Sequence, residues 1–131
     1  MADAPETVTS RTRRILVVED EDNIAMALQY VIEREGHRYF RIADGAEAEG
    51  AIRDIRPDLI LLDIMLPQVS GYDICQSVRQ DPELAGVKIL MMTARGSAAQ
   101  RDRALSVGAD GFFAKPFSLD DLREKMRAHL G

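Results

Sequence analysis

Five short apolar runs, separated by longer amphipathic stretches, restrict the fold of this sequence more than any other feature. The runs lie at Ile15–Val18, Tyr39–Ala43, Leu59–Leu62, Val87–Met92 and Phe112–Ala114. They are rich in Val, Ile, Leu and Phe, as is typical of strands buried on both faces of a sheet. Because each run is followed by a helical pattern, the sequence predicts an α/β fold with a parallel sheet covered by helices on both sides.

The stretches between the runs carry helix start signals. Ser70, Ser97 and Ser118 are each followed three residues later by Asp or Gln, which is the spacing of a capping box, although Asp is shorter than the usual Glu. Asp22 is expected to cap the first helix and Asp44 to open the second. Five strand–helix pairs therefore account for nearly the whole chain.

Length and charge limit the classes of protein to which the chain can belong. At 131 residues it has room for one ordinary domain, which we place at residues 14–131 behind a flexible tail at residues 1–13. Seventeen basic and twenty-two acidic residues give a net charge of −5. Such an acidic chain lacks the positive footprint of a nucleic-acid-binding domain, so we expect no direct contact with DNA or RNA.

The lone cysteine and the short apolar runs indicate in which cellular compartment the protein is expected. Cys75 is the only cysteine, so an intramolecular disulfide is excluded and a reducing compartment is expected. The longest strictly apolar runs are far too short to span a membrane, and the first fourteen residues lack the hydrophobic stretch of a signal peptide. The sequence therefore predicts a cytoplasmic protein without a membrane partner.

Charged and hydroxyl side chains stand at four of the five strand ends. Glu19 and Asp20 follow the first run, Asp63 the third, Thr93 the fourth and Lys115 the fifth. In an open parallel sheet, ligands bind beyond the carboxyl ends of the strands, where the strand order reverses. We therefore expect these five side chains to converge in one crevice.

The three carboxylates of this set indicate a cation site. At a separation of about 5 Å, each pair repels by ~3 kcal/mol at an effective dielectric constant near 20. Mg²⁺ fits because it needs only one or two direct carboxylates and keeps positions for water and a phosphate. An EF-hand loop is excluded, because Ile24 and Ala25 stand where that loop needs an oxygen ligand and a glycine. A nucleophile, metal ligands, a hydroxyl and an ammonium together describe a site for phosphoryl chemistry.

Four segments, each at a strand end, carry a resemblance to a known family. They are ILVVEDE at 15–21, DLILLDIMLPQVSG at 58–71, MMTA at 91–94 and KPF at 115–117. From about Arg14 to Leu130 the chain resembles the receiver domain of two-component response regulators, the CheY-like family. The resemblance implies a flavodoxin-like, five-stranded, doubly wound parallel sheet of strand order 2-1-3-4-5 with five helices. It also implies a phosphoacceptor in a phosphorelay that catalyses its own phosphorylation and dephosphorylation, rather than an enzyme.

The resemblance implies a role for each carboxylate. Asp63 would accept a phosphoryl group from a phosphohistidine on a sensor histidine kinase or a histidine phosphotransfer protein. Asp20 and Asp63 would bind Mg²⁺ directly, together with the backbone carbonyl of Met65. Glu19 would act on the metal mainly through water. Glu19 also stands where the family more often has Asp, and we expect activity to survive that difference.

The same resemblance implies a switch. Thr93 would bond one phosphoryl oxygen and Lys115 another, and the Lys115–Pro116 peptide bond would be cis. Phe112 occupies the aromatic switch position and would turn inward when Thr93 moves towards the phosphoryl group. The surface that changes would be residues 97–130, where we expect an output partner of unknown identity and where a homodimer also remains open.

Two positions flank the expected path of hydrolytic water. Met65 lies two residues after the acceptor and Arg95 two residues after Thr93. Neither side chain offers a carboxylate or an amide that could position a water molecule. We therefore hypothesise slow self-dephosphorylation.

Four alternatives were considered, and the sequence argues against the first two. A phosphatase with an Asp nucleophile needs a second acid two residues later, and Met65 stands there. A nucleotide carrier lacks its glycine-rich loop. The chain could instead be a degenerate receiver that acts as a phosphorylation-independent binding module. It could also be the N-terminal receiver part of a DNA-binding transcriptional regulator, although we expect a stand-alone receiver.

Overall fold

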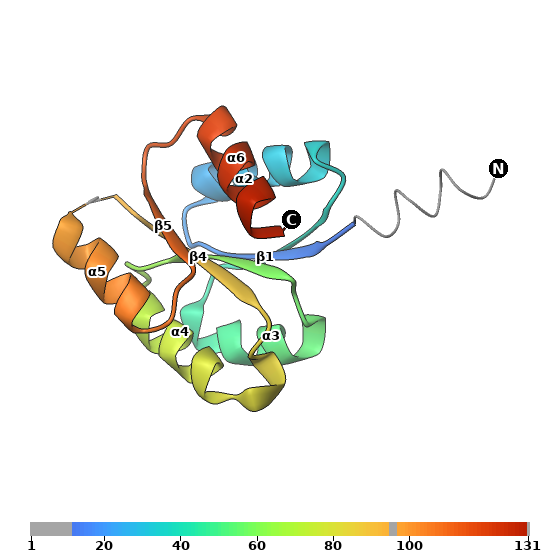
Figure 1. Cartoon of the computed structure of the whole chain (residues 1–131). Helices are drawn as coiled ribbons and strands as arrows, with labels where there is room; N and C mark the ends of the chain where they lie inside the picture. The colour runs from blue at the N-terminus through green and yellow to red at the C-terminus, as the bar shows by residue number, and fades with distance from the viewer. Residues whose placement is uncertain (1–11, 95–96, 131) are drawn as a thin grey trace.

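The computed structural model describes residues 12–94 and 97–130, with helices labelled α2 to α6 as in Figure 1. Most of the tail predicted at residues 1–13 lies outside this part. The strands are β1 Arg14–Val18, β2 Arg38–Ile42, β3 Leu59–Asp63, β4 Lys88–Thr93 and β5 Gly111–Ala114. The helices are α2 Asp22–Arg34, α3 Ala48–Ile55, α4 Gly71–Gln80, α5 Ala98–Ser106 and α6 Leu119–Leu130. Two short 3₁₀ turns lie at Gly45–Glu47 and Pro82–Leu84.

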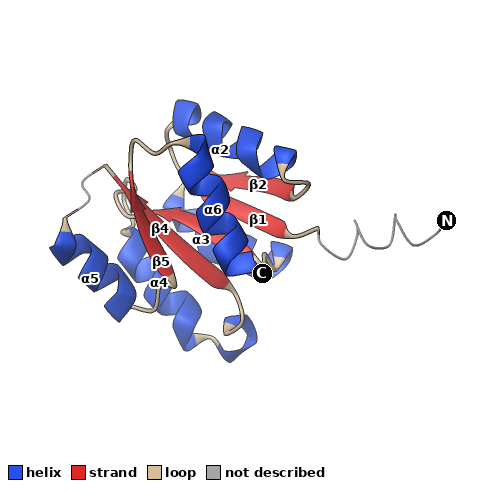
Figure 2. Ribbon diagram, turned by 45° about the horizontal axis from the view of Figure 1, so that its top comes forward, coloured by secondary structure: helices blue, strands red, loops and turns tan. Residues whose placement is uncertain are grey.

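The five strands form one parallel sheet in the order β2-β1-β3-β4-β5, which confirms the predicted fold. Helices α2 and α6 cover one face of the sheet, and α3, α4 and α5 cover the other (Figures 1 and 2). No helix in the described part of the chain is long and apolar enough to cross a membrane.

Alternating side chains of the strands feed two separate cores. On β1, Leu16 and Val18 join the core under α3 to α5, while Ile15 and Val17 join the core under α2 and α6. Because both faces are covered, the central strands are apolar at nearly every position. The edge strand β2 is only partly buried, so it tolerates Arg38 and Arg41.

The structure revises two boundaries and one cap. Asp63 and Thr93 are the last residues of β3 and β4 rather than the residues that follow them. The three predicted serine caps are confirmed, since each hydroxyl accepts a backbone N–H bond from the first turn of its helix. The prediction that Asp22 caps the first helix is wrong. Asp22 is already the first residue of α2, and its carboxylate pairs with Arg41 at 2.8 Å.

The turn between α2 and β2 predicts a pH dependence of folding. His37 is half-buried, and its Nδ1 accepts the backbone N–H of Arg13 at 3.1 Å. Burial lowers the pKa of His37 below its ordinary 6.5, against an opposing attraction from Glu35. As the pH falls through 6.5, His37 therefore binds a proton in the unfolded chain before it does so in the folded protein, and the stability of the fold decreases.

Urea titrations across about pH 7.5 to 5.5 check this expectation. The unfolding midpoint should drop through this range in the parent protein, and the His37→Asn variant, which keeps an acceptor but does not titrate, should show a smaller drop. Equal pH dependence of the two proteins would contradict the prediction.

Candidate functional site

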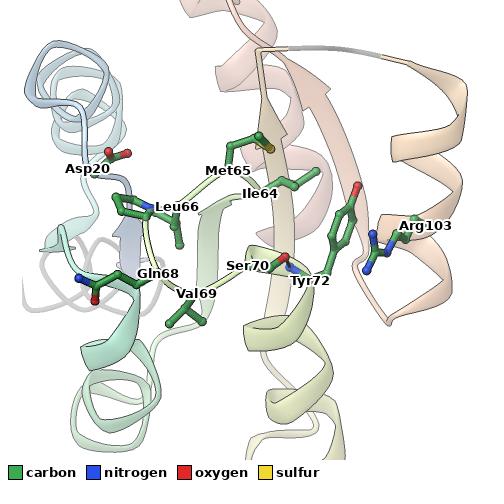
Figure 3. A pocket seen from close by; sticks show the side chains of 10 residues that line it. Asp20, Ile64, Met65, Leu66, Gln68, Val69, Ser70, Tyr72 and Arg103 are labelled. Carbon is green, nitrogen blue, oxygen red and sulfur yellow. Dashed lines mark hydrogen bonds between the residues drawn. The ribbon is translucent and has the colours of Figure 1, made fainter.

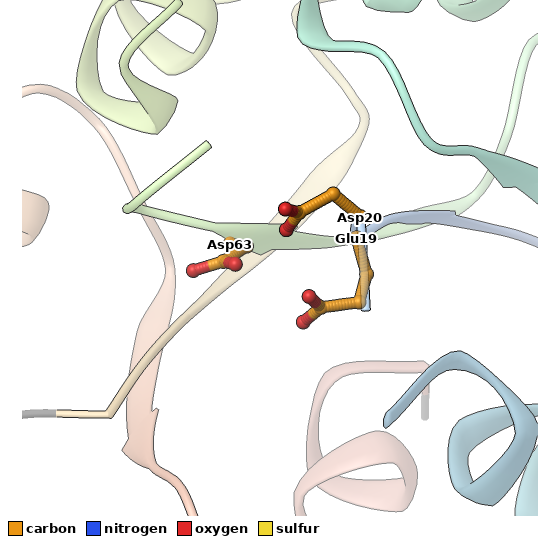
Figure 4. A group of neighbouring side chains, drawn as sticks. All are labelled: Glu19, Asp20 and Asp63. Atoms are coloured by element: carbon orange, nitrogen blue, oxygen red, sulfur yellow. The ribbon is translucent and has the colours of Figure 1, made fainter. Parts of the chain in front are cut away.

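The strand order reverses between β1 and β3, and the acidic residues meet at that point. Glu19 and Asp20 follow β1, and Asp63 ends the neighbouring β3. One carboxylate oxygen from each residue lies within 4.8 Å of the others (Figure 4). The structure therefore brings the predicted carboxylates together at the position where this fold class binds ligands.

Asp63 is held by both of its oxygens. Oδ1 accepts the backbone N–H of Met65 at 3.0 Å, and Oδ2 lies 3.3 Å from the Lys115 ammonium. The residue is 3% exposed, and its backbone is in register with Met92 of β4. A central strand thus fixes the direction of this carboxylate.

Lys115 directly follows the edge strand β5 and contacts two of the carboxylates. Its Nζ lies 2.6 Å from Glu19 Oε1, and the lysine side chain is only 8% exposed. Burial acts to lower the pKa of Lys115, but the hydrogen bond to Glu19 and the charges of Glu19 and Asp63 outweigh it and raise that pKa. Lys115 is therefore a fixed positive charge in the site. The Lys115–Pro116 peptide bond is cis.

The two acidic residues after β1 have different surroundings. Glu19 is fully buried, and burial raises its pKa although the bond from Lys115 opposes the rise. Asp20 is exposed, and its carboxylate has no hydrogen-bond or ion-pair partner among residues 12–94 and 97–130. An open carboxylate beside Asp63 is a ligand set that suits a hard divalent cation such as Mg²⁺.

Thr93 and Phe112 lie on the neighbouring strands β4 and β5, and Phe112 is in register with Met91, two residues before Thr93. Thr93 is fully buried at the end of β4, one residue after Met92, the register partner of Asp63. Its carbonyl accepts the backbone N–H of Lys115 at 2.7 Å. Phe112 on β5 is half-buried against the core under α3 to α5. The predicted Arg95 lies outside the described residues.

An open cavity of about 660 Å³ adjoins the acidic cluster (Figure 3). Its wall runs from Asp20 along the loop at residues 64–70 to Tyr72 and Arg103. Met65 is 66% exposed there, and the Arg103 guanidinium stacks on the Tyr72 ring at 4.1 Å. The cavity gives solvent and small molecules access to Asp20 from the side of α4 and α5.

Arg41 is a residue of the site that was not predicted from the sequence. Its guanidinium donates two hydrogen bonds to the Glu19 carbonyl, at 3.1 and 3.0 Å, and one to Asp22 at 2.8 Å. These bonds fix the path of the chain between β1 and α2, and with it the directions of the acidic side chains. The signal was a lone arginine inside an otherwise apolar strand run.

Gly71 is the last residue of the motif at residues 58–71, and the structure explains why it is glycine. A Cβ at this position would lie 2.3 Å from the Asp63 carbonyl oxygen and 2.8 Å from Ile64 Cα, both of which are backbone atoms. Since neither can move without distorting the loop after Asp63, Gly71→Ala should destabilise the fold by about 1–3 kcal/mol. Urea unfolding measures the loss. Gly50→Ala on α3, where a Cβ meets nothing within 4 Å, is the matched control and should not be destabilised.

Comparisons with known proteins agree with the fold and the site described above. The chain fits the family model of the response regulator receiver domain over residues 15–127. The phosphate regulon transcriptional regulatory protein PhoB of Rhizobium meliloti (strain 1021) is 44% identical over 117 residues, which cover 89% of this chain and 52% of PhoB. The chain spans about half the length of the curated relatives it matches.

Solved structures agree with this match. A protein of Chloroflexus aurantiacus J-10-fl assigned as a response regulator superposes with a TM-score of 0.87 at 34% identity, covering 91% of this chain and 98% of that one. The BeF₃-activated N-terminal receiver domain of Klebsiella pneumoniae RstA gives 0.82 at 28% identity, covering 88% and 97%. Motif, topology and family model agree over most of the sequence, and the chain belongs to the response regulator receiver domain family.

Proposed function

We propose that Asp63 is the phosphoacceptor of this receiver domain and takes its phosphoryl group from a phosphohistidine on a sensor kinase or a phosphotransfer protein. The observation that carries the proposal is the position of the Asp63 carboxylate, with the Lys115 ammonium at 3.3 Å and the other carboxylates within 4.8 Å. Membership of the receiver family supports it.

The transfer needs a nucleophile in line and positive charge on the phosphoryl oxygens. An Asp63 oxygen attacks the phosphorus, a P–O bond forms, and the P–N bond of the phosphohistidine breaks with its electron pair left on the imidazole nitrogen. Lys115 supplies a fixed positive charge beside the attacking group. An ammonium has three N–H donors, and Glu19 and Asp63 use two of them, so one remains for a phosphoryl oxygen.

Asp20 and Asp63 would hold Mg²⁺, with the Met65 backbone carbonyl as a third ligand. The bound cation supplies charge that offsets the negative charge on the phosphoryl oxygens. The open Asp20 carboxylate next to Asp63 supports this assignment.

Removal of the metal should therefore slow the transfer of a phosphoryl group to the chain. In Mg²⁺, a small acyl phosphate or a phosphoramidate should add one phosphoryl group to the chain, measured by intact mass. Excess EDTA should reduce the rate by more than about tenfold, because the equatorial charge is no longer offset, and added Mg²⁺ should restore it. An equal rate in EDTA would contradict the metal assignment.

The switch would couple Asp63 to the surface formed by residues 97–130. Phosphorylation adds charge and acceptor oxygens next to Thr93 and Lys115, which can then shift towards them. Phe112 is half-buried beside the core of α4 and α5, so an inward turn would repack that face. We place the output partner there.

We also propose that the phosphoryl group on Asp63 is hydrolysed slowly. The Met65 side chain is exposed at the rim of the site and has a thioether, which cannot orient a water molecule for attack. Arg95 is the second residue of this hypothesis. Loss of label from the isolated phosphoprotein in Mg²⁺ measures the lifetime.

A second candidate concerns the whole protein. Relatives named as a transcriptional regulatory protein and as DNA-binding response regulators are about twice as long as the matched region. This favours the role of N-terminal receiver in a DNA-binding regulator over the stand-alone receiver that we expected. The mass of the protein in its native source separates the two.

We place either form in the cytoplasm. The lone Cys75 is buried, and burial raises the pKa of its thiol to about 11, so the thiol stays protonated.

A further inference from the structure

We propose that Met65 is an oxidation site through which a peroxide shortens the lifetime of the phosphoryl group on Asp63. The inference rests on the proposed function and extends it, because slow hydrolysis would then belong only to the protein with a reduced Met65. The reagent is a hydroperoxide, in the simplest case hydrogen peroxide, and the product is methionine sulfoxide.

The methionines in the described part of the chain fall into two groups. Met91, Met92 and Met126 are buried in the two cores, so their thioethers are shielded from reagents in solution. Met65 and Met26 are instead 66% and 65% exposed. Oxidation makes a methionine side chain polar, which disrupts a core but is tolerated where the side chain points into water. The folded protein can therefore carry a sulfoxide at Met65.

Met65 differs from Met26 in its relation to the acceptor. The backbone N–H of Met65 donates to Asp63 Oδ1 at 3.0 Å, which holds the residue beside the acceptor. Its side chain lines the open cavity that Asp20 also lines (Figure 3). Met26 lies on α2, which covers the opposite face of the sheet from α4 and α5 (Figures 1 and 2). Of these two exposed thioethers, Met65 is therefore the one at the acidic site.

The oxidation step transfers one oxygen atom to sulfur. A lone pair of Met65 Sδ attacks one oxygen of hydrogen peroxide, so that an S–O bond forms and the O–O bond breaks. The departing hydroxide then takes the proton of the transferred oxygen and leaves as water. The sulfur is thereby oxidised and the peroxide reduced, and methionine sulfoxide reductases reverse the change.

The sulfoxide supplies a group that the thioether lacks. A thioether sulfur is only a weak hydrogen-bond acceptor, whereas a sulfoxide oxygen carries a large negative partial charge and accepts readily from water. The unbranched methionine side chain is flexible, so this oxygen can hold a water molecule next to the phosphoryl group on Asp63. Because a positioned water attacks more often than a free one, the oxidised protein should lose its phosphoryl group about three to ten times faster.

The lone cysteine does not compete for a mild oxidant. Cys75 is fully buried, and burial raises the pKa of its thiol to about 11. The thiolate is the form of cysteine that peroxides attack, and little of it is present near neutral pH. A change caused by peroxide can therefore be assigned to methionine by comparing variants.

Two variants provide the matched comparison. Met26→Leu keeps Met65 as an exposed methionine, and Met65→Leu keeps Met26. Each protein is treated with hydrogen peroxide, which catalase then removes, and tandem mass spectrometry of its peptides identifies the oxidised positions. It is next phosphorylated with a small acyl phosphate in Mg²⁺, and loss of the phosphoryl group is followed by intact mass.

Oxidation should shorten the phosphoryl lifetime of Met26→Leu by about three- to tenfold and leave that of Met65→Leu as it was before peroxide. A methionine sulfoxide reductase should restore the longer lifetime in Met26→Leu. An unchanged lifetime in Met26→Leu that carries sulfoxide at Met65 would overturn the proposal. Equal shortening in Met65→Leu would overturn it as well.

A further variant makes the test without an oxidant. Met65→Gln places an amide oxygen on a side chain of similar length, and it should lose the phosphoryl group faster than the parent before any peroxide is added. A lifetime equal to that of the parent would contradict the role of an acceptor at this position. A parent protein that takes up no phosphoryl group would instead contradict the proposed function, and the inference would fall with it.

Discussion

Asp63→Asn should lose phosphoryl uptake by more than about 10³-fold, because an amide replaces the nucleophile while the rest of the site remains. The amide oxygen can still accept the Met65 N–H, which binds Oδ1 in the parent protein. The strand that carries residue 63 is buried at every position and makes its contacts through backbone and apolar side chains, so the fold should persist. Transfer from a small acyl phosphate in Mg²⁺, followed by intact mass, measures the effect.

The matched control is the same substitution at an exposed aspartate. Asp54→Asn removes an equal charge from an exposed position near the end of α3, which leads into the start of β3 rather than its carboxyl end, and this variant should accept a phosphoryl group at the parental rate. If Asp63→Asn were labelled as fast as Asp54→Asn, another residue would be the acceptor.

The second large effect is on stability. Lys115→Met should destabilise the metal-free protein by about 3 kcal/mol, because it leaves the fully buried Glu19 carboxylate without its cation. The cost of a broken buried pair is largely the cost of the uncompensated charge. Glu19→Gln in the Lys115→Met background removes that charge and should recover much of the loss.

Acid should also reduce the penalty. In the parent, burial already raises the pKa of Glu19, and loss of Lys115 removes the hydrogen bond that opposes the rise. In folded Lys115→Met, Glu19 therefore binds its proton at a higher pH than in the unfolded chain, where its ordinary pKa is 4.5. The loss of stability of this variant relative to the parent should therefore become smaller as the pH falls.

Urea unfolding of both variants in EDTA measures these differences, with Lys125→Met on α6 as the control. A Lys115→Met protein as stable as the Lys125→Met protein would show that solvent reaches Glu19 and that the pair is not buried in solution.

The fold could be predicted from local patterns because both faces of the sheet are covered. Apolar runs marked the strands and serine hydroxyls marked three helix starts, and both signals depend on residues close together in the sequence. The boundaries were less certain for a physical reason. Asp63 still pairs its backbone with β4 although its side chain is charged, so composition ended the strand one residue early. Asp22 was predicted to be a helix cap because aspartate is common at that position, but its carboxylate forms an ion pair with Arg41 on β2.

The residue types at the strand ends were sufficient to predict which residues form the site. They were not sufficient to predict the contacts between those residues. Lys115 contacts both Glu19, at 2.6 Å, and Asp63, at 3.3 Å, and no local pattern encodes pairings across 96 and 52 positions of the chain. The need for glycine at residue 71 depends on the backbone of the preceding loop, which is equally invisible in the sequence.

The central claim is that one aspartate carries the phosphoryl group, and chemical mapping tests it most directly. The chain is phosphorylated in Mg²⁺ and reduced with borohydride, which converts an acyl phosphate to the alcohol, and its peptides are then sequenced by tandem mass spectrometry. We predict homoserine at residue 63 alone. Homoserine at Asp20 or another aspartate, with residue 63 unchanged, would contradict the account.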